Sequence, residues 1–257
     1  MSAHNMATLA KREWRLLKMA LIFFTRIPMR VDDFEEQDLN RSAKYFPLVG
    51  IVVGVVAAAA FGIALFFLPL ELAVLASMVA TIMVTGAFHE DGLADAVDGL
   101  GGSFDKARAL VIMQDSRIGS YGAIALVLGL LIKFEALIHI SAPLLPGVLV
   151  AGHALSRFCA LLVIYLQPYV RSEGKSKPLA TTLSRQELAI AAVFGLLPLA
   201  LLAPTFLLAL IPVAIVWLWF SYKLKARLGG YTGDCLGAMQ QMTEIVFYLG
   251  IVMWSTY

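Results

Sequence analysis

Long apolar segments alternate with shorter polar connections along most of the chain. About 20 mostly apolar helical residues are needed to cross the hydrocarbon core of a bilayer. On that criterion the sequence predicts spans at 45–67, 71–89, 121–141, 145–167, 187–203, 205–222 and 235–255. The fifth and sixth are short and separated only by Pro204, so they form either a tight hairpin or one broken element. We therefore expect an all-α integral membrane protein, a polytopic helical bundle of about seven transmembrane helices (roughly six to eight).

The N-terminal segment 1–44 is polar and basic before it becomes apolar. Residues 7–24 have the spacing of an amphipathic helix that lies in the membrane interface. Its basic residues are Lys11, Arg12, Arg15 and Lys18, and its apolar ones are Leu9, Trp14, Leu17 and Leu21. The alternative is an ordinary cytoplasmic helix packed on the bundle. An acidic loop then leads to the membrane, with Asp32, Asp33, Glu35, Glu36 and Asp38.

The composition supports membrane insertion and excludes other classes. Of the 257 residues, 60% are hydrophobic and 15% charged, against about 45–50% and 25% in soluble domains. The net charge of +2 is too small to indicate a nucleic-acid partner. Cys159 and Cys235 lie far apart in apolar surroundings, and we interpret both as small core residues. With no internal repeat, residues 1–257 are interpreted as a single transmembrane catalytic domain.

The basic residues indicate an orientation. Eighteen of the 20 fall in 1–44, 90–120, 168–186 and 223–234, which alternate with the predicted spans so as to share one side. Because basic loops stay in the cytoplasm, we expect the N-terminus and these connections to be cytoplasmic. The C-terminus then lies on the opposite face, with Trp254 and Tyr257 as an aromatic anchor at the interface.

The cytoplasmic connection 90–120 opens with four acids in nine residues. In a helix, Asp91, Asp95 and Asp98 would share one stripe, and Glu90 precedes them. Like charges at that spacing repel, and a hard divalent cation such as Mg²⁺ or Mn²⁺ is their natural counter-charge. The alternative is a solvated acidic loop. His89-Glu90 is not a zinc H-E-x-x-H motif, since position 93 is Leu.

Several polar residues fall inside predicted spans or open them. Lys133 and Arg157 are costly at membrane depth and indicate a site or a pair. His153 and Arg157 share a helix face and could bind an anion, or Arg157 could pair with Glu244, and Lys133 could simply snorkel. Asp234 follows a glycine-rich turn and either caps the last span or lies beside bound phosphate.

Metal-binding carboxylates beside basic residues at a membrane surface favour phosphoryl transfer. A transporter using Lys133, Glu135, Arg157 and Glu244 is the alternative of a different class. Matching broken helices in two halves are missing, and the densest charge lies at one surface, which disfavours transport.

Six sequence blocks resemble the cobalamin synthase family (adenosylcobinamide-GDP ribazoletransferase). The central ones are His89-Glu90-Asp91-Gly92-Leu93-Ala94-Asp95 with Asp98-Gly99, and Met113 to Gly122, which contains Asp115-Ser116-Arg117. The others are Phe24 to Pro28, Tyr45 to Gly50, His153 to Arg157 and Gly230 to Asp234. The resemblance implies a membrane enzyme that joins adenosylcobinamide-GDP to α-ribazole or its 5′-phosphate, releases GMP and uses Mg²⁺. A CDP-alcohol phosphotransferase is the alternative enzyme, although its acidic motif is spaced differently.

The resulting hypothesis assigns roles to named residues. Metal binding falls to Glu90, Asp91, Asp95 and Asp98 (not necessarily all), with Asp98 or Asp95 as the base. The catalytic set is Asp91, Asp95, Asp98 and Arg117. The substrate-binding set is Arg26, Asp115, Ser116, His153, Arg157 and Asp234, with Asp115 either completing the metal site or orienting Arg117. The expected partners are the two small-molecule substrates and the lipid bilayer. A homo-oligomer would use the small residues Gly50, Gly54, Ala57 and Ala58.

Overall fold

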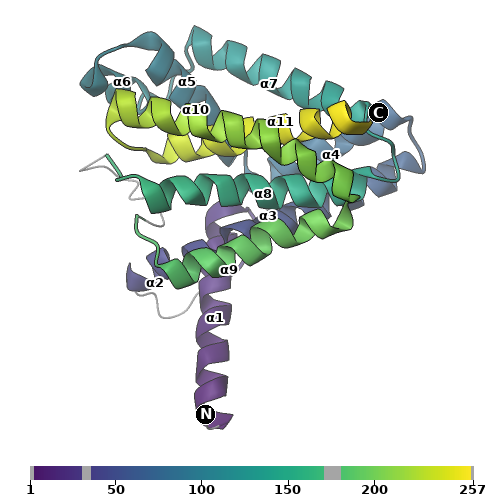
Figure 1. Ribbon diagram of the computed structural model, residues 1–257, viewed down its shortest axis with the longest axis horizontal. Helices are drawn as coiled ribbons and strands as arrows, with labels where there is room; N and C mark the ends of the chain where they lie inside the picture. The colour runs from purple at the N-terminus through teal and green to yellow at the C-terminus, as the bar shows by residue number, and fades with distance from the viewer. Residues whose placement is uncertain (1–2, 31–35, 171–180, 256–257) are drawn as a thin grey trace.

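The computed structural model describes residues 3–30, 36–170 and 181–255, and the regular elements of this part of the chain are all helices (Figure 1). Asp32, Asp33, Glu35, the side chain of Glu36, and Tyr257 lie outside the described residues. The helices before the acidic stretch are α1 (Ala3–Phe24), α2 (Glu36–Ser42), α3 (Phe46–Leu65) and α4 (Leu70–Thr85), with the 3₁₀ turn η1 (Ala43–Tyr45) between α2 and α3. The acidic stretch and its connection form α5 (Phe88–Gly102) and α6 (Lys106–Ile112). The remainder is α7 (Ser120–Ile138), α8 (Leu145–Leu166), α9 (Arg185–Leu196), the 3₁₀ segments η2 (Leu197–Leu201) and η3 (Pro204–Ala209), α10 (Leu210–Leu228) and α11 (Gly233–Ser255).

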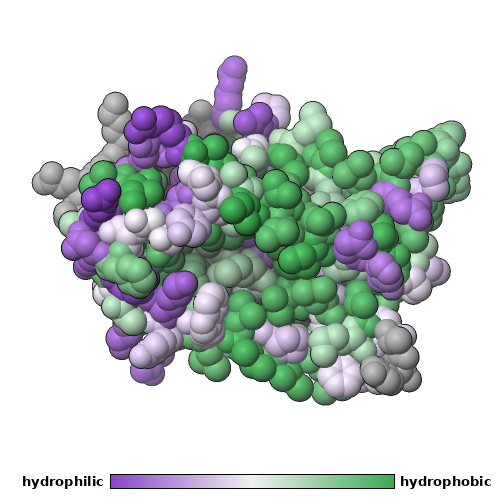
Figure 2. All heavy atoms as spheres, turned by 90° about the horizontal axis from the view of Figure 1, so that it is seen from above, coloured by the Kyte–Doolittle hydropathy of each residue, from purple (hydrophilic) through white to green (hydrophobic). Residues whose placement is uncertain are grey.

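The all-α membrane fold is confirmed, with fewer spans than predicted. Five helical stretches of the described chain are long and apolar enough to cross a bilayer: Asp38–Leu65, Ser120–Ile138, Leu145–Leu166, Pro204–Leu228 and Gly233–Ser255. A sixth exists if α4 and α5, which meet at 85°, are counted as one broken span. Polar side chains gather at one end of the bundle, next to a broad apolar surface (Figure 2).

The predicted fifth span, 187–203, is wrong. Its helix α9 has only 12 residues, because a 3₁₀ segment with Pro198 in its first turn follows it and Pro204 begins the next. The tight hairpin is wrong as well, since α9 packs on α3 and α8 whereas α10 packs on α11. The chain between them connects two faces of the bundle.

Helix α1 combines the two predicted alternatives. It crosses the long axis of the bundle and extends past it (Figure 1). Leu16 and Leu21 in its second half are buried against the bundle, while Leu9 and Trp14 are exposed. The exposed part suits a membrane interface, and the second half is ordinary packing.

Close helix packing explains the small residues of α3. A Cβ on Gly50 would lie 2.8 Å from Cα of Ala154, and one on Gly54 would lie 2.6 Å from Cα of Val150, both in α8. Ala57 is fully buried. This face therefore packs within the chain and gives no support to the predicted homo-oligomer. Cys159 and Cys235 are buried and are not joined by a disulfide, as predicted.

Candidate functional site

The chain turns sharply between α4 and α5, at the polar end of the bundle. Gly86 and Ala87 both adopt the left-handed conformation, with φ of 67° and 58°. Gly86 is required for a second reason, because a Cβ there would lie 3.0 Å from Cζ of Arg26. The amide of Arg26 also donates a hydrogen bond to the carbonyl of Val84 at 2.7 Å. The corner therefore holds the exposed Arg26 side chain beside the start of α5.

Helix α5 carries the acidic stretch, and its helical conformation is confirmed. The carboxylates nevertheless differ in their surroundings: Glu90 and Asp98 are buried, Asp95 is half-buried and Asp91 is exposed. Within the described residues, no hydrogen bond or ion pair reaches the Asp91 side chain. Asp91 is thus open to a ligand from outside the bundle.

Asp98, near the end of α5, directs its side chain to the start of α7. Its two oxygens accept hydrogen bonds from the amides of Gly119 at 2.7 Å and Gly122 at 2.8 Å. A carboxylate at this position satisfies amides that have no partner in their own helix and faces the positive end of the helix dipole. This geometry gives Asp98 a structural function, independent of any ligand.

Glu90 points into the bundle, toward α11. One oxygen accepts a hydrogen bond from Nε2 of Gln241 at 3.0 Å, and the other is buried without a hydrogen-bond partner in the described structure. Gln241 also donates to Oε1 of Gln240 at 3.0 Å. Glu90 is therefore linked to a polar network deeper in the membrane.

That network is centred on Glu244, which is fully buried. The Glu244 carboxylate pairs with Lys133 of α7 and with Nδ1 of His153 at 2.9 Å, and accepts hydrogen bonds from Gln240 and Tyr248. Arg157 donates to the carbonyl of His153 at 3.1 Å and is also buried.

Two sequence interpretations change with this network. Lys133 does not snorkel, because it is buried in an ion pair with Glu244. His153 and Arg157 do not form a cationic surface open to solvent, since each is only 3% exposed. Tyr248 was missed by the sequence analysis, although it lies four residues after Glu244 and so shares its helix face.

Asp234 is brought beside α5 by a close helix crossing. A Cβ on Gly92 would lie 3.1 Å from the carbonyl oxygen of Asp234 and 3.1 Å from Cα of Gly237, so α5 and α11 meet at these glycines. Asp234 is not the cap of α11. That cap is Thr232, whose hydroxyl accepts a hydrogen bond from the amide of Cys235 at 3.3 Å.

Asp115 and Arg117 form an exposed pair in the loop between α6 and α7. Nη2 of Arg117 lies 2.7 Å from Oδ2 of Asp115, and the Arg117 amide donates to Oδ1 at 3.1 Å. These hydrogen bonds lower the pKa of Asp115 to about 2. Asp115 therefore orients Arg117, the second of the two predicted alternatives, and Ser116 between them is exposed.

The described carboxylates do not form a complete metal cage. In residues 3–30, 36–170 and 181–255, no three His, Cys, Asp or Glu side chains lie close enough to hold a metal ion. Mg²⁺ is commonly held by one or two carboxylates together with substrate phosphates and water. Asp91 and Asp95, one helical turn apart, with Asp91 open to solvent, fit that kind of site.

Comparisons with known proteins agree over nearly the whole chain. A family model described as cobalamin-5-phosphate synthase matches residues 16–252. A Shewanella amazonensis protein named adenosylcobinamide-GDP ribazoletransferase is 45% identical, over 95% of this chain and 98% of the relative. A Ralstonia pickettii protein of the same name is 44% identical, over 96% and 98%. No solved structure matches the chain.

Proposed function

Because the chain belongs to the cobalamin-5-phosphate synthase family, we propose that it is a membrane-embedded transferase that joins adenosylcobinamide-GDP to α-ribazole, or to its 5′-phosphate, and releases GMP. The observation that carries this proposal is nearly full-length similarity to relatives named for this donor and acceptor. The exposed carboxylate of α5, at the polar end of an apolar bundle, supports it.

In this reaction a ribose hydroxyl of the acceptor attacks the phosphorus that carries the cobinamide. An oxygen–phosphorus bond forms there, the bond from that phosphorus to the oxygen of GMP breaks, and the hydroxyl proton passes to a base. We assign the base to Asp95, because Asp98 is buried and both its oxygens hold the start of α7.

Asp91 and Asp95 are the residues we expect to bind Mg²⁺ together with the diphosphate of the donor. When bound, the ion would offset the negative charge that develops on the phosphates. Asp91 faces outward and has no partner in the described structure, so it can reach a ligand without losing an internal contact.

The basic groups at the same end of the bundle are suited to bind phosphate. Arg26 lies at the start of α5, and the loop of Arg117 is joined to the end of α5 through Gly119 and Asp98. Asp115 accepts hydrogen bonds from Nε and Nη2 of Arg117, which fixes the direction of the guanidinium group and leaves its other N–H groups to bind a ligand. Arg26 and Arg117 would bind the phosphates of the donor and of the leaving GMP.

The buried polar residues act indirectly in this proposal. We assign Glu90, His153 and Arg157 to positioning, because they lie inside the bundle with Glu244 and not on its surface. Asp234 remains a candidate for substrate binding, since the crossing at Gly92 places its backbone beside α5.

We place the site on the cytoplasmic side of a bacterial inner membrane. The support is the concentration of basic residues in the connections at the same end of the bundle as α5. The donor carries a charged diphosphate and therefore reaches the site from the aqueous phase, which fits this side.

The test is turnover by the full chain in liposomes, given adenosylcobinamide-GDP, α-ribazole and Mg²⁺. We expect the complete corrinoid and GMP in equal amounts, and loss of both when EDTA is added. Turnover that persists in EDTA would refute the metal requirement but would not contradict the proposed transferase reaction. Absence of any product in folded protein, or release of CMP from CDP-linked donors, would refute the proposed reaction.

A further inference from the structure

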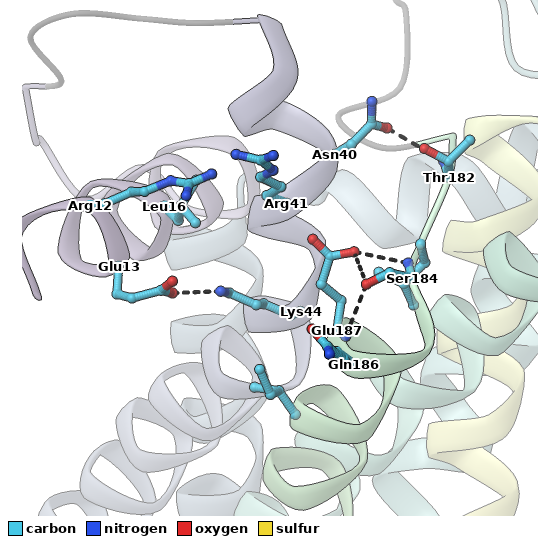
Figure 3. Close-up of a pocket in the computed structure, with 12 residues that line it drawn as sticks. Arg12, Glu13, Leu16, Asn40, Arg41, Lys44, Thr182, Ser184, Gln186 and Glu187 are labelled. Carbon is cyan, nitrogen blue, oxygen red and sulfur yellow. Dashed lines mark hydrogen bonds and ion pairs between the residues drawn. The ribbon is translucent and has the colours of Figure 1, made fainter. Parts of the chain in front are cut away.

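A polar pocket of about 760 Å³ lies apart from α5, where α1, the α2–η1 segment and the start of α9 meet (Figure 3). Helix α1 contributes Arg12, Glu13 and Leu16. Asn40, Arg41 and Lys44 line a second side, and the third is formed by residues 182–184, 186–187 and 190. None of these residues belongs to the site proposed above.

The carboxylates that line the pocket are already engaged. Glu13 pairs with Lys44 and accepts a hydrogen bond from the hydroxyl of Tyr45 at 2.6 Å. Burial works to raise the pKa of Glu13, but these hydrogen bonds outweigh it and lower the pKa. Glu187 accepts hydrogen bonds from the amide and hydroxyl of Ser184, at 2.8 and 2.7 Å, and so caps its own helix.

Two guanidinium groups lack a matching counter-charge inside the pocket. Arg12 and Arg41 point toward one another across it (Figure 3). Arg12 forms a long ion pair of 3.9 Å with Asp38, which does not line the pocket and pairs more closely with Arg15. No described carboxylate lies within ion-pair distance of Arg41. Like charges that converge in this way repel unless an anion lies between them.

We propose that this pocket binds a phosphate group between Arg12 and Arg41. Guanidinium groups match phosphate geometry and bind it through two parallel hydrogen bonds. The phosphate has two candidate sources: the head group of an anionic phospholipid and a free phosphomonoester. The pocket adjoins α1, whose Leu9 and Trp14 are exposed as in a helix lying in the membrane interface, and this favours the lipid.

The test is binding to the full chain in a neutral detergent, followed by native mass spectrometry during titration. The probes are phosphatidylglycerol, phosphatidylcholine as the zwitterionic head group, and inorganic phosphate. We expect one phosphatidylglycerol per chain at concentrations where phosphatidylcholine is not retained. We expect the apparent Kd to rise about tenfold or more in Arg41→Gln, because a charge-assisted contact is lost.

The matched control is Lys11→Gln, which removes a charge from the same helix outside the pocket. In this variant the Kd for phosphatidylglycerol should change by less than about twofold, because salt screens the long-range attraction between the basic residues of α1 and an anionic lipid. Arg41 is exposed and has no described partner, so its loss should leave folding intact. Arg12→Gln should weaken binding in the same way.

Each remaining outcome decides the proposal. Equal retention of both lipids with no binding of inorganic phosphate, or equal losses in Arg41→Gln and Lys11→Gln, would overturn it. Binding of inorganic phosphate that depends on Arg41, without preference between the lipids, would uphold the phosphate site and overturn the lipid source. Binding is measured without turnover, so failure of the proposed reaction would not affect the result.

Discussion

At the scale of single residues, the acids of α5 share a short stretch of sequence but have different surroundings. Asp91 is exposed, whereas Asp98 is 7% exposed and bonded to two amides. Removing the charge of Asp91 should therefore mainly reduce turnover, whereas removing the charge of Asp98 should mainly reduce stability.

Asp91→Asn keeps the shape of the side chain and removes its charge. If Asp91 binds the metal, we expect kcat to fall by about 10²–10³-fold, the size typical of losing a group that stabilises transition-state charge. The unfolding midpoint should not change, because the side chain has no described partner. Release of GMP and thermal unfolding in detergent measure the two effects.

The matched control for Asp91→Asn is Glu135→Gln. Glu135 is also an exposed helical carboxylate, near the other end of α7, and should tolerate the change with full turnover. Normal GMP release by Asp91→Asn would refute the assignment of Asp91 to metal binding.

Asp98→Asn should act first on stability. The amide nitrogen of Asn would face either the Gly119 or the Gly122 amide, leaving a buried donor without an acceptor. Such a group costs about 1–3 kcal/mol, which lowers the midpoint by roughly 2–12 °C for a chain of this size. An unchanged midpoint in a thermal scan, together with lost turnover, would instead assign Asp98 to catalysis.

At the scale of elements, the architecture depends on helices that approach closely at glycines. The crossing of α5 and α11 at Gly92 and Gly237 places Asp234 beside the acidic helix. The crossing of α3 and α8 at Gly50 and Gly54 supports the other side of the polar network, since Gly50 lies against the backbone of His153.

Gly50→Ala should destabilise the protein, because the new methyl group would clash with the carbonyl oxygen of His153. Overpacking of this kind costs about 1–3 kcal/mol. The control is Gly62→Ala on the same helix, where a Cβ meets nothing within 4 Å. Alanine is the better helix former by up to about 1 kcal/mol, so this variant should be neutral or slightly more stable.

Thermal unfolding of the two variants side by side gives the answer. A midpoint for Gly50→Ala equal to that of Gly62→Ala would mean that α3 and α8 pack less closely than described.

At the scale of the whole molecule, the basic connections at one end of the apolar bundle determine the orientation that we expect for the chain in the membrane. Phe104 lies in the connection after α5 and is 89% exposed, while Phe66 follows α3 at the other end and is 87% exposed. The two positions should therefore face opposite sides of the membrane.

Phe66→Cys should react with an impermeant maleimide on intact cells, and Phe104→Cys only after the cells are made permeable. Cys159 and Cys235 are buried, which keeps the background low. The reverse pattern would place the acidic site outside the cytoplasm and contradict the orientation expected from the basic residues.

The sequence by itself determined the class of fold and the motif blocks. Apolar length predicts membrane helices because a bilayer imposes one length on every span. This length criterion gave a wrong span at 187–203, because prolines break the helix there while the stretch as a whole remains apolar. The same criterion predicts nothing about the 85° turn at Gly86 and Ala87, which is a backbone conformation.

Tertiary structure alone decided the partners of each polar residue. Lys133, His153 and Glu244 come from three helices, and their pairing depends on which faces meet. Asp98 and Asp91 have the same chemistry and lie two helical turns apart, yet one meets the start of α7 and the other meets solvent. The pocket at Arg12 and Arg41 likewise exists only because α1, the α2–η1 segment and the start of α9 meet in the fold. Residue type determines what a side chain can bind, and packing determines what lies within its reach.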